Sequence, residues 1–350
     1  MRTDTPEAQQ RRWVVVDTDT GLDDAHALLY LLAQPDVEIL GITAVYGNAR
    51  VDQAARNAAT VLDVAGRLDV PVHLGAAGPL RGEPAIDTFW HGADGLGDRG
   101  LPVARGECQR ESAAEFLVRI ATEQPGRIDL LAIGPLTNLA LALDIDPHLL
   151  GKFRSVVIMG GGGPYPAPGG LTLTDSNSNH DRLAAERVYT APNTDNVVMV
   201  GVNVTLQALL DEADHERLRR QPGRWAAFAA EVLDASNATY QYTWGRRVSA
   251  AHDGLAAVIL HRPSVVQRWV EGPVTFTATA GSLAVQVART YDGDPLSFDT
   301  APGPSIRAAT VVDRAEFRQV FMAGLMHHGP ASRERDAGQS GLDSGPRPGS

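Results

Sequence analysis

The 350-residue sequence contains only one cysteine, Cys108, and only one lysine, Lys152. A single cysteine excludes an intrachain disulfide and a thiolate-rich metal site. The formal net charge of -11 disfavours a nucleic-acid backbone as a partner. No apolar run reaches the roughly 20 residues that a membrane-spanning helix needs, so we expect no membrane partner. The N-terminal residues show no signal-peptide pattern, and we therefore expect a cytoplasmic protein.

Short apolar runs alternate with helix-like segments along most of the chain. Because the runs are continuous, they are typical of strands that are covered on both faces. Strand, helix and strand in succession predict an α/β fold with an open, mainly parallel, Rossmann-like sheet and helices on both faces. The predicted strands cover 13–16, 37–46, 128–133, 155–161 and 196–202, and the predicted helices include 51–66, 111–124 and 136–145.

The same pattern predicts one domain at residues 12–328. Polar and glycine-rich composition predicts a disordered leader at 1–11 and a disordered tail at 329–350. Polar or glycine-rich segments follow four of the predicted strands: DTDTGLDD, GN, GPLTN and GGGG. Ligands of such folds bind beyond the carboxyl ends of the strands, so we expect the active site at that edge of the sheet.

Four aspartates, Asp17, Asp19, Asp23 and Asp24, lie within eight residues behind the first predicted strand. Like charges this close repel one another, and a hard cation with oxygen ligands is their simplest partner. No Cys/His ligand set indicates zinc. The structural alternative is that these residues form a turn and begin a helix, and it is strongest for Asp17. Taken alone, Asp253 is similarly explained as a helix N-cap.

Taken together, these segments resemble a known family. DTDTGLDDAHAL resembles the N-terminal signature of the inosine–uridine preferring nucleoside hydrolases, D-x-D-x-G-x-D-D-A-x-A-L. Six further segments follow in the family's order: VYGN, WHGADGLG, AIGPLTNLALAL, VVIMGGG, SNSNHDRLAAERV and AHDGLAAV. The resemblance implies a Ca²⁺-dependent enzyme that hydrolyses the N-glycosidic bond of a small-molecule ribonucleoside. It also implies a homodimer or homotetramer.

The resemblance further implies roles for individual residues. Asp19, Asp24, Asp253 and the backbone carbonyl of Ile133 would ligate Ca²⁺. A cation of this kind lowers the pKa of a bound water, and Asp19 would accept the proton as general base. The transition state resembles an oxocarbenium ion, and His252 would protonate the leaving base.

The remaining implied contacts hold the substrate. The residues implied for ribose are Asp23, Asn48, Met159, Asp175 and Asn177. The residues implied for the base pocket are His91 and Tyr240, with Tyr242 and Trp244 as alternatives on the same segment. Each of these histidines and aromatics has a structural alternative as an ordinary core residue, and the sequence does not indicate a base preference.

The chain departs from the family near the 5′ side of the expected ribose site. Asp175 stands where the family usually has a glutamate, and the preceding segment GGGGPYPAPGGLTLT is rich in glycine and proline. An asparagine that the family often carries is replaced in the stretch around Gly169 and Gly170. These departures suggest the hypothesis that the 5′ side is more open and accepts a modified 5′ position or a different sugar.

Two alternative functions stay open at this point. The first is a nucleoside- or sugar-binding protein on the same fold, which would not need both a general base and an acid. A haloacid dehalogenase-like phosphatase would use Asp17 as nucleophile and Lys152 near a late strand. The acids expected after that strand are missing from MGGG, and the pair His252-Asp253 would have no role.

Overall fold

The computed structural model describes residues 11–101, 104, 108–279, 281–288 and 304–327. The predicted leader at 1–11 and the predicted tail at 329–350 lie outside these residues, except for residue 11. The domain limits at 12 and 328 therefore stay a prediction. Within the described residues, no helix is both long and apolar enough to cross a membrane.

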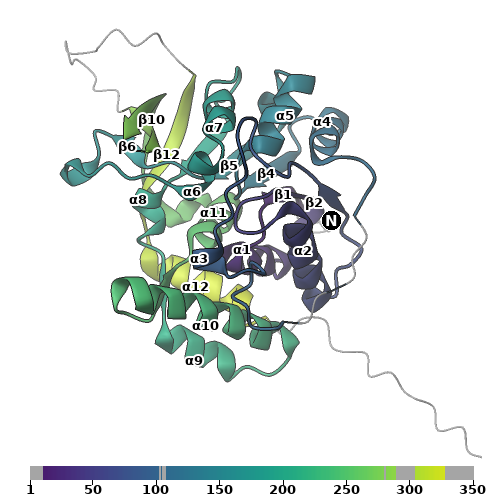
Figure 1. The fold of residues 1–350 in the computed structure, drawn as a ribbon, viewed down its shortest axis with the longest axis vertical. Helices are drawn as coiled ribbons and strands as arrows, with labels where there is room; N and C mark the ends of the chain where they lie inside the picture. Colours follow the sequence, from purple (N-terminus) through teal and green to yellow (C-terminus); the bar gives the residue numbers. More distant parts are fainter. Residues whose placement is uncertain (1–10, 102–103, 105–107, 280, 289–303, 328–350) are drawn as a thin grey trace, which may run out of the picture.

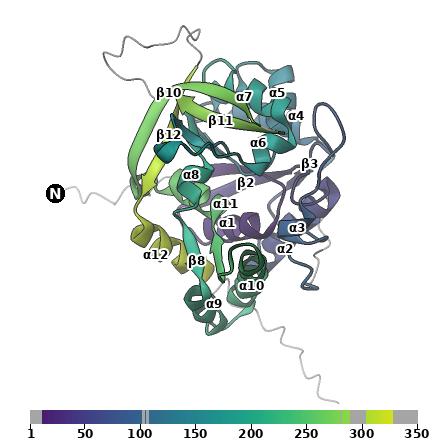
Figure 2. The same cartoon turned by 60° about the vertical axis from the view of Figure 1, so that its left-hand side comes forward.

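A central ten-stranded sheet has the strand order β3-β2-β1-β4-β5-β7-β12-β10-β11-β6 (Figures 1 and 2). From β3 to β12 neighbouring strands are parallel, whereas β10 runs antiparallel to both β12 and β11. The sheet strands are β1 (Arg12–Thr18), β2 (Val37–Ala44), β3 (Val72–Leu74), β4 (Ile128–Ala132), β5 (Ser155–Met159), β6 (Gly163–Tyr165), β7 (Val197–Val200), β10 (Val266–Thr279), β11 (Ser282–Ala288) and β12 (Ser305–Val312). A separate antiparallel pair consists of β8 (Leu209–Asp211) and β9 (Val248–Ala250).

Helices cover both faces of this sheet, as the apolar pattern predicts (Figures 1 and 2). They are α1 (Leu22–Leu32), α2 (Val51–Ala65), α3 (Thr88–His91), α4 (Ala113–Glu123), α5 (Thr137–Ile145), α6 (Ser176–His180), α7 (Arg182–Tyr189), α8 (Val202–Thr205), α9 (Glu212–Arg219), α10 (Arg224–Trp244), α11 (His252–His261) and α12 (Arg314–Leu325). Each predicted strand and helix is present, with ends that differ from the prediction by up to two residues, and the fold is the expected mainly parallel α/β class.

The buried strand residues divide alternately between two hydrophobic clusters. In β1, Val14 and Val16 join the cluster that contains α1, α10, α11 and α12, while Val15 joins the cluster that contains α4, α5 and α7. This alternation follows from the two-residue period of a strand, and it explains why β1 is apolar at every position from Trp13 to Val16. Residues at the carboxyl end of β1 have no freedom to shift register, because both faces are packed.

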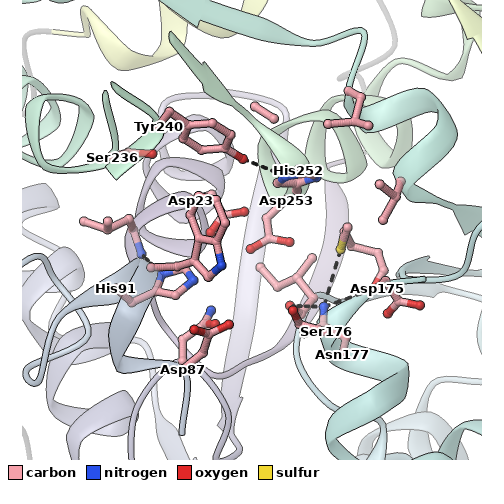
Figure 3. Close-up of a pocket in the computed structure, with 18 of the residues that line it drawn as sticks. Asp23, Asp87, His91, Asp175, Ser176, Asn177, Ser236, Tyr240, His252 and Asp253 are labelled. Atoms are coloured by element: carbon pink, nitrogen blue, oxygen red, sulfur yellow. Dashed lines mark hydrogen bonds between the residues drawn. The ribbon is translucent and has the colours of Figure 1, made fainter. Parts of the chain in front are cut away.

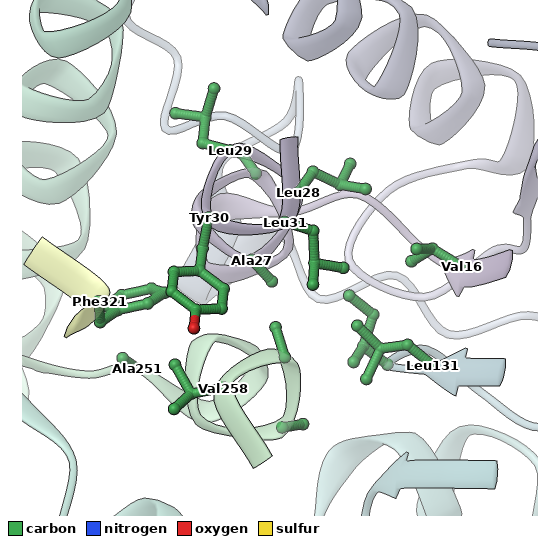
Figure 4. Close-up of a cluster of buried hydrophobic side chains, with 14 of the residues drawn as sticks. Val16, Ala27, Leu28, Leu29, Tyr30, Leu31, Leu131, Ala251, Val258 and Phe321 are labelled. Atoms are coloured by element: carbon green, nitrogen blue, oxygen red, sulfur yellow. The ribbon is translucent and has the colours of Figure 1, made fainter. Parts of the chain in front are cut away.

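Helix α1 lies at the centre of the first cluster. Figure 4 shows its residues between Val16 of β1 on one side and Val258 of α11 and Phe321 of α12 on the other. The first turn of α1 carries Asp23 and Asp24, and the first turn of α11 carries Asp253. Packing of α1 against α11 therefore brings these acidic helix ends together at the carboxyl edge of the sheet.

We predict that Leu28→Ala lowers the free energy of unfolding by about 3 kcal/mol, because Leu28 is fully buried and its truncation leaves a cavity. Leu183→Ala is the matched control, since this α7 leucine is 41% exposed. We expect it to change stability by less than about 0.5 kcal/mol. Urea unfolding measures both values, and equal losses would contradict the assigned role of α1 in the core.

Candidate active site

A cavity of about 310 Å³ opens at the carboxyl edge of the sheet, within the range of about 300–1,000 Å³ that small-molecule sites occupy. Most of the residues that the sequence indicates line it, and Figure 3 shows Asp23, His91, Asn177, Tyr240, His252 and Asp253 around the same space. They are Asp23, Asn48, His91, Ile133, Met159, Asp175, Asn177, Tyr240, His252 and Asp253. Asp19 and Asp24 are fully buried directly behind this lining.

The amide of Asn48 joins the two fully buried aspartates. Its Nδ2 donates to Asp19 Oδ1 at 3.2 Å and to Asp24 Oδ2 at 2.9 Å, and its backbone N–H donates to Asp19 Oδ2 at 2.7 Å. Asp24 also accepts from Thr18 Oγ1 at 2.5 Å and from the backbone N–H of Gly21 at 2.9 Å. These bonds fix the carboxylates, and they leave Asn48 Oδ1 free to accept from a bound molecule.

Burial makes the acidic cluster electrostatically unfavourable by itself. Carboxylate oxygens of Asp23, Asp24 and Asp253 lie within 4.8 Å of one another. Desolvation, followed by the charges of neighbouring aspartates, raises the pKa of Asp19 and of Asp253 well above the usual range, and it raises the pKa of Asp23 to about 7. No lysine or arginine lines the cavity among the described residues, so no side chain there supplies a positive charge.

An all-oxygen set of this kind matches a hard divalent cation. Ca²⁺ binds carboxylates and backbone carbonyls, and both donor types are present here. The backbone carbonyl of Ile133 lies at the cavity and accepts from Asn177 Nδ2 at 3.0 Å, which leaves its second lone pair available. The indicated ligands fit such a cation in their chemistry, and Asp24 and Asp253, together with Asp23, have carboxylate oxygens close enough to share one ion.

Asp17 has a different environment. It is fully buried and does not line the cavity. Its Oδ1 accepts from Thr43 Oγ1 at 2.5 Å and from Asn138 Nδ2 at 2.7 Å, and burial raises its pKa to about 7. Asp17 thus connects β1 to β2 and α5; it lies inside a strand and is not the turn former that the structural alternative describes.

His252 lies between two hydroxyl groups at the cavity wall. Its Nδ1 is 2.6 Å from Thr205 Oγ1, and its Nε2 is 3.1 Å from the Tyr240 hydroxyl, as the dashed line in Figure 3 shows. Burial lowers the pKa of His252 to about 4, so the ring is neutral at pH 7 in the free protein and carries one N–H group. The two contacts hold the ring in a single orientation.

Aromatic side chains from α3 and α10 form one wall of the cavity. Trp90 contacts Tyr240 with ring centroids 5.1 Å apart, and Tyr240 contacts Trp244 at 4.7 Å. All three line the cavity, whereas Tyr242 is 82% exposed and lies outside its lining. A planar heterocyclic ring is the kind of group that such a wall binds, since aromatic faces pack well against it.

His91 faces the same region from the end of α3. Its Nδ1 accepts from the backbone N–H of Leu22 at 3.2 Å, and burial lowers its pKa to about 3. The ring is therefore neutral, with its proton on Nε2. No described protein group accepts a hydrogen bond from this Nε2–H.

The opposite side of the cavity carries Asn177, Met159 and Asp175. Asn177 Nδ2 donates to the backbone carbonyls of Ile133 and Met159 at 3.0 and 3.1 Å, so its Oδ1 is left for a ligand. Asp175 is the N-cap of α6, and both of its carboxylate oxygens accept from backbone N–H groups.

Sequence reasoning missed several residues of the site. Thr205, which contacts His252, follows the predicted strand at 196–202 and could have been found as a polar residue at the same edge. Asp87, Ser176 and Ser236 also line the cavity. Ser176 opens the motif SNSNHDRLAAERV but was given no role, whereas Asp87 and Ser236 lie outside the named motifs and no sequence pattern indicates them.

The comparison with known proteins agrees with this geometry. The family model described as "Inosine-uridine preferring nucleoside hydrolase" matches residues 14–319. A probable uridine nucleosidase 1 of Oryza sativa subsp. japonica is 34% identical over 292 residues, which is 83% of this chain and 86% of the relative.

Two solved structures share the fold. A plant nucleoside hydrolase is 28% identical with a TM-score of 0.81, covering 90% of this chain and 99% of that one. A purine-preferring ribonucleoside hydrolase from Gardnerella vaginalis is 26% identical with a TM-score of 0.79, covering 90% and 98%. The chain therefore belongs to the inosine-uridine preferring nucleoside hydrolase family, which is a family of enzymes.

Family membership and the structure both argue against the phosphatase alternative. Lys152 lies at the amino end of β5, away from the cavity lining, where its Nζ is 2.5 Å from Asp146 Oδ2 and 3.0 Å from Thr122 Oγ1. It cannot neutralise a phosphoryl group at the carboxyl edge of the sheet.

We predict that Gly47→Ala destabilises the site. Gly47 has φ +151°, and a Cβ there would lie 2.1 Å from Asp19 Oδ2, so the Asp19 carboxylate must move. We expect a loss of about 2 kcal/mol in the free energy of unfolding, as for other overpacked sites. Gly78→Ala is the control, because its nearest new contact is an ordinary 3.5 Å. A Gly47→Ala protein as stable as the control would contradict the packing described here.

Proposed function

We propose that this enzyme hydrolyses the N-glycosidic bond of ribonucleosides and releases ribose and the free base. The observation that supports the proposal most strongly is the cavity itself. It has an oxygen-only acidic cluster on one side and an aromatic wall with two neutral histidines on the other. A nucleoside has matching parts, namely a ribose diol that binds to a hard cation and a flat base that packs on aromatic rings.

We propose Ca²⁺ as the cation, held by the carboxylates of Asp19, Asp24 and Asp253 and by the Ile133 carbonyl, with Asp23 at the same cluster. Bound there, the ion would orient a water and lower its pKa. A second acidic group, Glu212, His215 and Glu216, also has ligand atoms close together. Its Glu212 carboxylate already pairs with Arg247 at 2.6 Å, so it needs no cation.

In this mechanism Asp19 accepts the proton of the attacking water as the bond from the anomeric carbon to the base breaks. The developing oxocarbenium charge is stabilised by the aspartates beneath it. Asn48 and Asp23 bind the 2′- and 3′-hydroxyls, and Asn177 binds the sugar from the opposite side, above Met159. Because the enzyme would bind the ribose at several points, part of the binding energy is available to stabilise the transition state.

The departing base needs a proton, and we assign its delivery to His252, whose ring, neutral in the free protein, must first take up a second proton from solvent. The ring is held by Thr205 and Tyr240 beside the aromatic wall, where the base would lie. His91 offers its Nε2 proton as a hydrogen bond to an acceptor atom on the base. Base preference is not assigned, because relatives of this chain include a probable uridine nucleosidase and a purine-preferring hydrolase.

The proposal is tested by measuring ribose release from a panel of purine and pyrimidine ribonucleosides, with and without a Ca²⁺ chelator. We expect release that the chelator abolishes and added Ca²⁺ restores. Asp19→Asn should lower kcat by at least about 10²-fold, the usual contribution of a general base. Tight nucleoside binding without any ribose release would instead support the alternative that the protein only binds its ligand.

We predict that His252→Ala reduces hydrolysis of ordinary nucleosides by about 10²–10⁴-fold, the range expected for loss of a general acid. Hydrolysis of p-nitrophenyl riboside should fall far less, because p-nitrophenolate leaves without a proton. His148→Ala, an exposed histidine outside the cavity lining, is the control and should leave both rates unchanged. Equal losses on both substrates in His252→Ala would contradict the acid role.

We also propose that the enzyme is cytoplasmic and assembles as a homodimer or homotetramer. Resemblance to the family supports the assembly. Size-exclusion chromatography with light scattering tests the assembly, and a monomer would contradict it.

A further inference from the structure

Thr205 is the hydrogen-bond partner that the described residues provide for Nδ1 of His252. Its Oγ1 lies 2.6 Å from that nitrogen. Thr205 is the last residue of α8 and is fully buried, so solvent does not compete for this contact. The residue does not line the cavity. Any effect of Thr205 on a bound molecule must therefore pass through His252.

The backbone around Thr205 is fixed independently of its hydroxyl. The N–H of Thr205 donates to the carbonyl of Gly201 at 3.1 Å, and its carbonyl accepts from the N–H of Ala208 at 3.0 Å. The carbonyl of Ala208 accepts in turn from the N–H of Ala251 at 2.8 Å, directly before His252. These bonds hold the end of α8 beside the start of α11. The hydroxyl can therefore be removed without releasing either segment.

The Tyr240 hydroxyl indicates which ring nitrogen of His252 carries the proton. Burial and the charge of Asp23 raise the pKa of Tyr240 above its usual value, while a hydrogen bond from the Ala250 backbone lowers it in part. The phenol therefore keeps its hydrogen at neutral pH. Within the described part of the chain, its acceptor is His252 Nε2, at 3.1 Å (Figure 3). A buried hydroxyl without an acceptor costs free energy, so we infer that Tyr240 donates and Nε2 accepts.

This assignment places the one proton of the neutral His252 ring on Nδ1. Thr205 Oγ1 then accepts from Nδ1–H, and its own hydrogen faces the backbone carbonyl of Val202 at 3.5 Å. Each of the three hydrogens has an acceptor in this arrangement. The reverse arrangement, with the proton on Nε2, leaves the Tyr240 hydrogen without an acceptor among the described residues.

We propose that Thr205 is a positioning residue, whose hydroxyl accepts the Nδ1 proton of His252 and so reserves Nε2 for proton delivery to the leaving base. The inference rests on the proposed function. In that reaction the ring takes up its second proton at Nε2, on the side of the aromatic wall. As the bond from the anomeric carbon breaks, the base keeps the electron pair and receives the Nε2 proton. Water adds to the anomeric carbon and gives its proton to Asp19, and the ring returns to the Nδ1–H form.

NMR of the Ca²⁺-supplemented protein, labelled with ¹⁵N at histidine, measures the tautomer directly, because protonated and bare ring nitrogens have well separated chemical shifts. The signals of His252 are those that disappear in His252→Gln. At neutral pH we expect a protonated Nδ1 and a bare Nε2 in the wild type, and a shift towards the Nε2–H form in Thr205→Val. A wild-type ring protonated on Nε2 would overturn the proposal, as would an unchanged tautomer in Thr205→Val.

The dependence of the rate on the leaving group tests the consequence for catalysis. Thr205→Val should lower kcat/KM for uridine or inosine by about 10- to 100-fold, the value of a hydrogen bond to a charged group. Hydrolysis of p-nitrophenyl riboside should fall far less, because its leaving group needs no proton. Thr205→Ser keeps the hydroxyl and should restore both rates. Equal losses on both substrates in Thr205→Val would mean that Thr205 only packs, and would overturn the proposal.

Thr60→Val is the matched control. Thr60 of α2 is buried outside the cavity lining, and its Oγ1 accepts from the N–H of Ala104 at 3.1 Å and donates to the carbonyl of Arg56 at 2.9 Å. The substitution therefore removes a buried hydroxyl with a similar pair of bonds. We expect the ratio of the two substrates to stay at its wild-type value. A ratio that changed as much as in Thr205→Val would overturn the assignment of the effect to His252.

The outcomes distinguish this inference from the function on which it rests. Nucleoside hydrolysis by the wild type, with either the Nε2–H tautomer or equal losses in Thr205→Val, would overturn only the inference about Thr205. Failure of the wild type to hydrolyse any nucleoside would overturn the proposed function, and the role of Thr205 in proton delivery with it.

Discussion

Repulsion among buried carboxylates is the constraint on which the rest of this site depends. Asp19, Asp24 and Asp253 have little or no exposure to solvent, and Asp23 lies with them. Such a group costs free energy unless hydrogen bonds and a positive charge compensate it. Asn48 and Thr18 supply the hydrogen bonds, while the amino ends of α1 and α11 supply favourable dipoles. The remaining charge is the one that a divalent cation would balance.

The fold holds this arrangement together through the packing of both faces of the sheet. Because β1 is apolar on both sides, its carboxyl end is fixed in the register that places Asp19 beside the loop containing Asn48. Gly47 is needed at that loop because the Asp19 carboxylate occupies the space of a side chain. The acidic cluster therefore forms one rigid unit with the loops that follow β1 and β2. The aromatic wall from α3 and α10 completes the cavity.

Much of the fold and the site could be predicted from the sequence. The strands of the parallel half are continuous apolar runs, so β1, β2, β4, β5 and β7 were predicted. The long strand β10 was not, because most of its residues are exposed or half-buried and polar residues interrupt its apolar ones. The short edge strands β3 and β6 are three residues each and carry no clear pattern.

The site residues found from the sequence are those that follow strand ends or belong to the family's motifs. Thr205 and Asp87 were missed because their importance comes from tertiary contacts. The bonds from Asp175 to Gly161 and Ser178 were also beyond sequence reasoning, since only the folded loop shows where that carboxylate points.

The most direct test of the account is a crystal structure of the protein grown with Ca²⁺, with the ion identified by its anomalous scattering. The account predicts one ion bound by Asp19, Asp24, Asp253 and the Ile133 carbonyl, with a side of its coordination shell open to the cavity. A cluster without an ion at saturating Ca²⁺ would contradict the account, as would an ion bound at Glu212 and Glu216 instead.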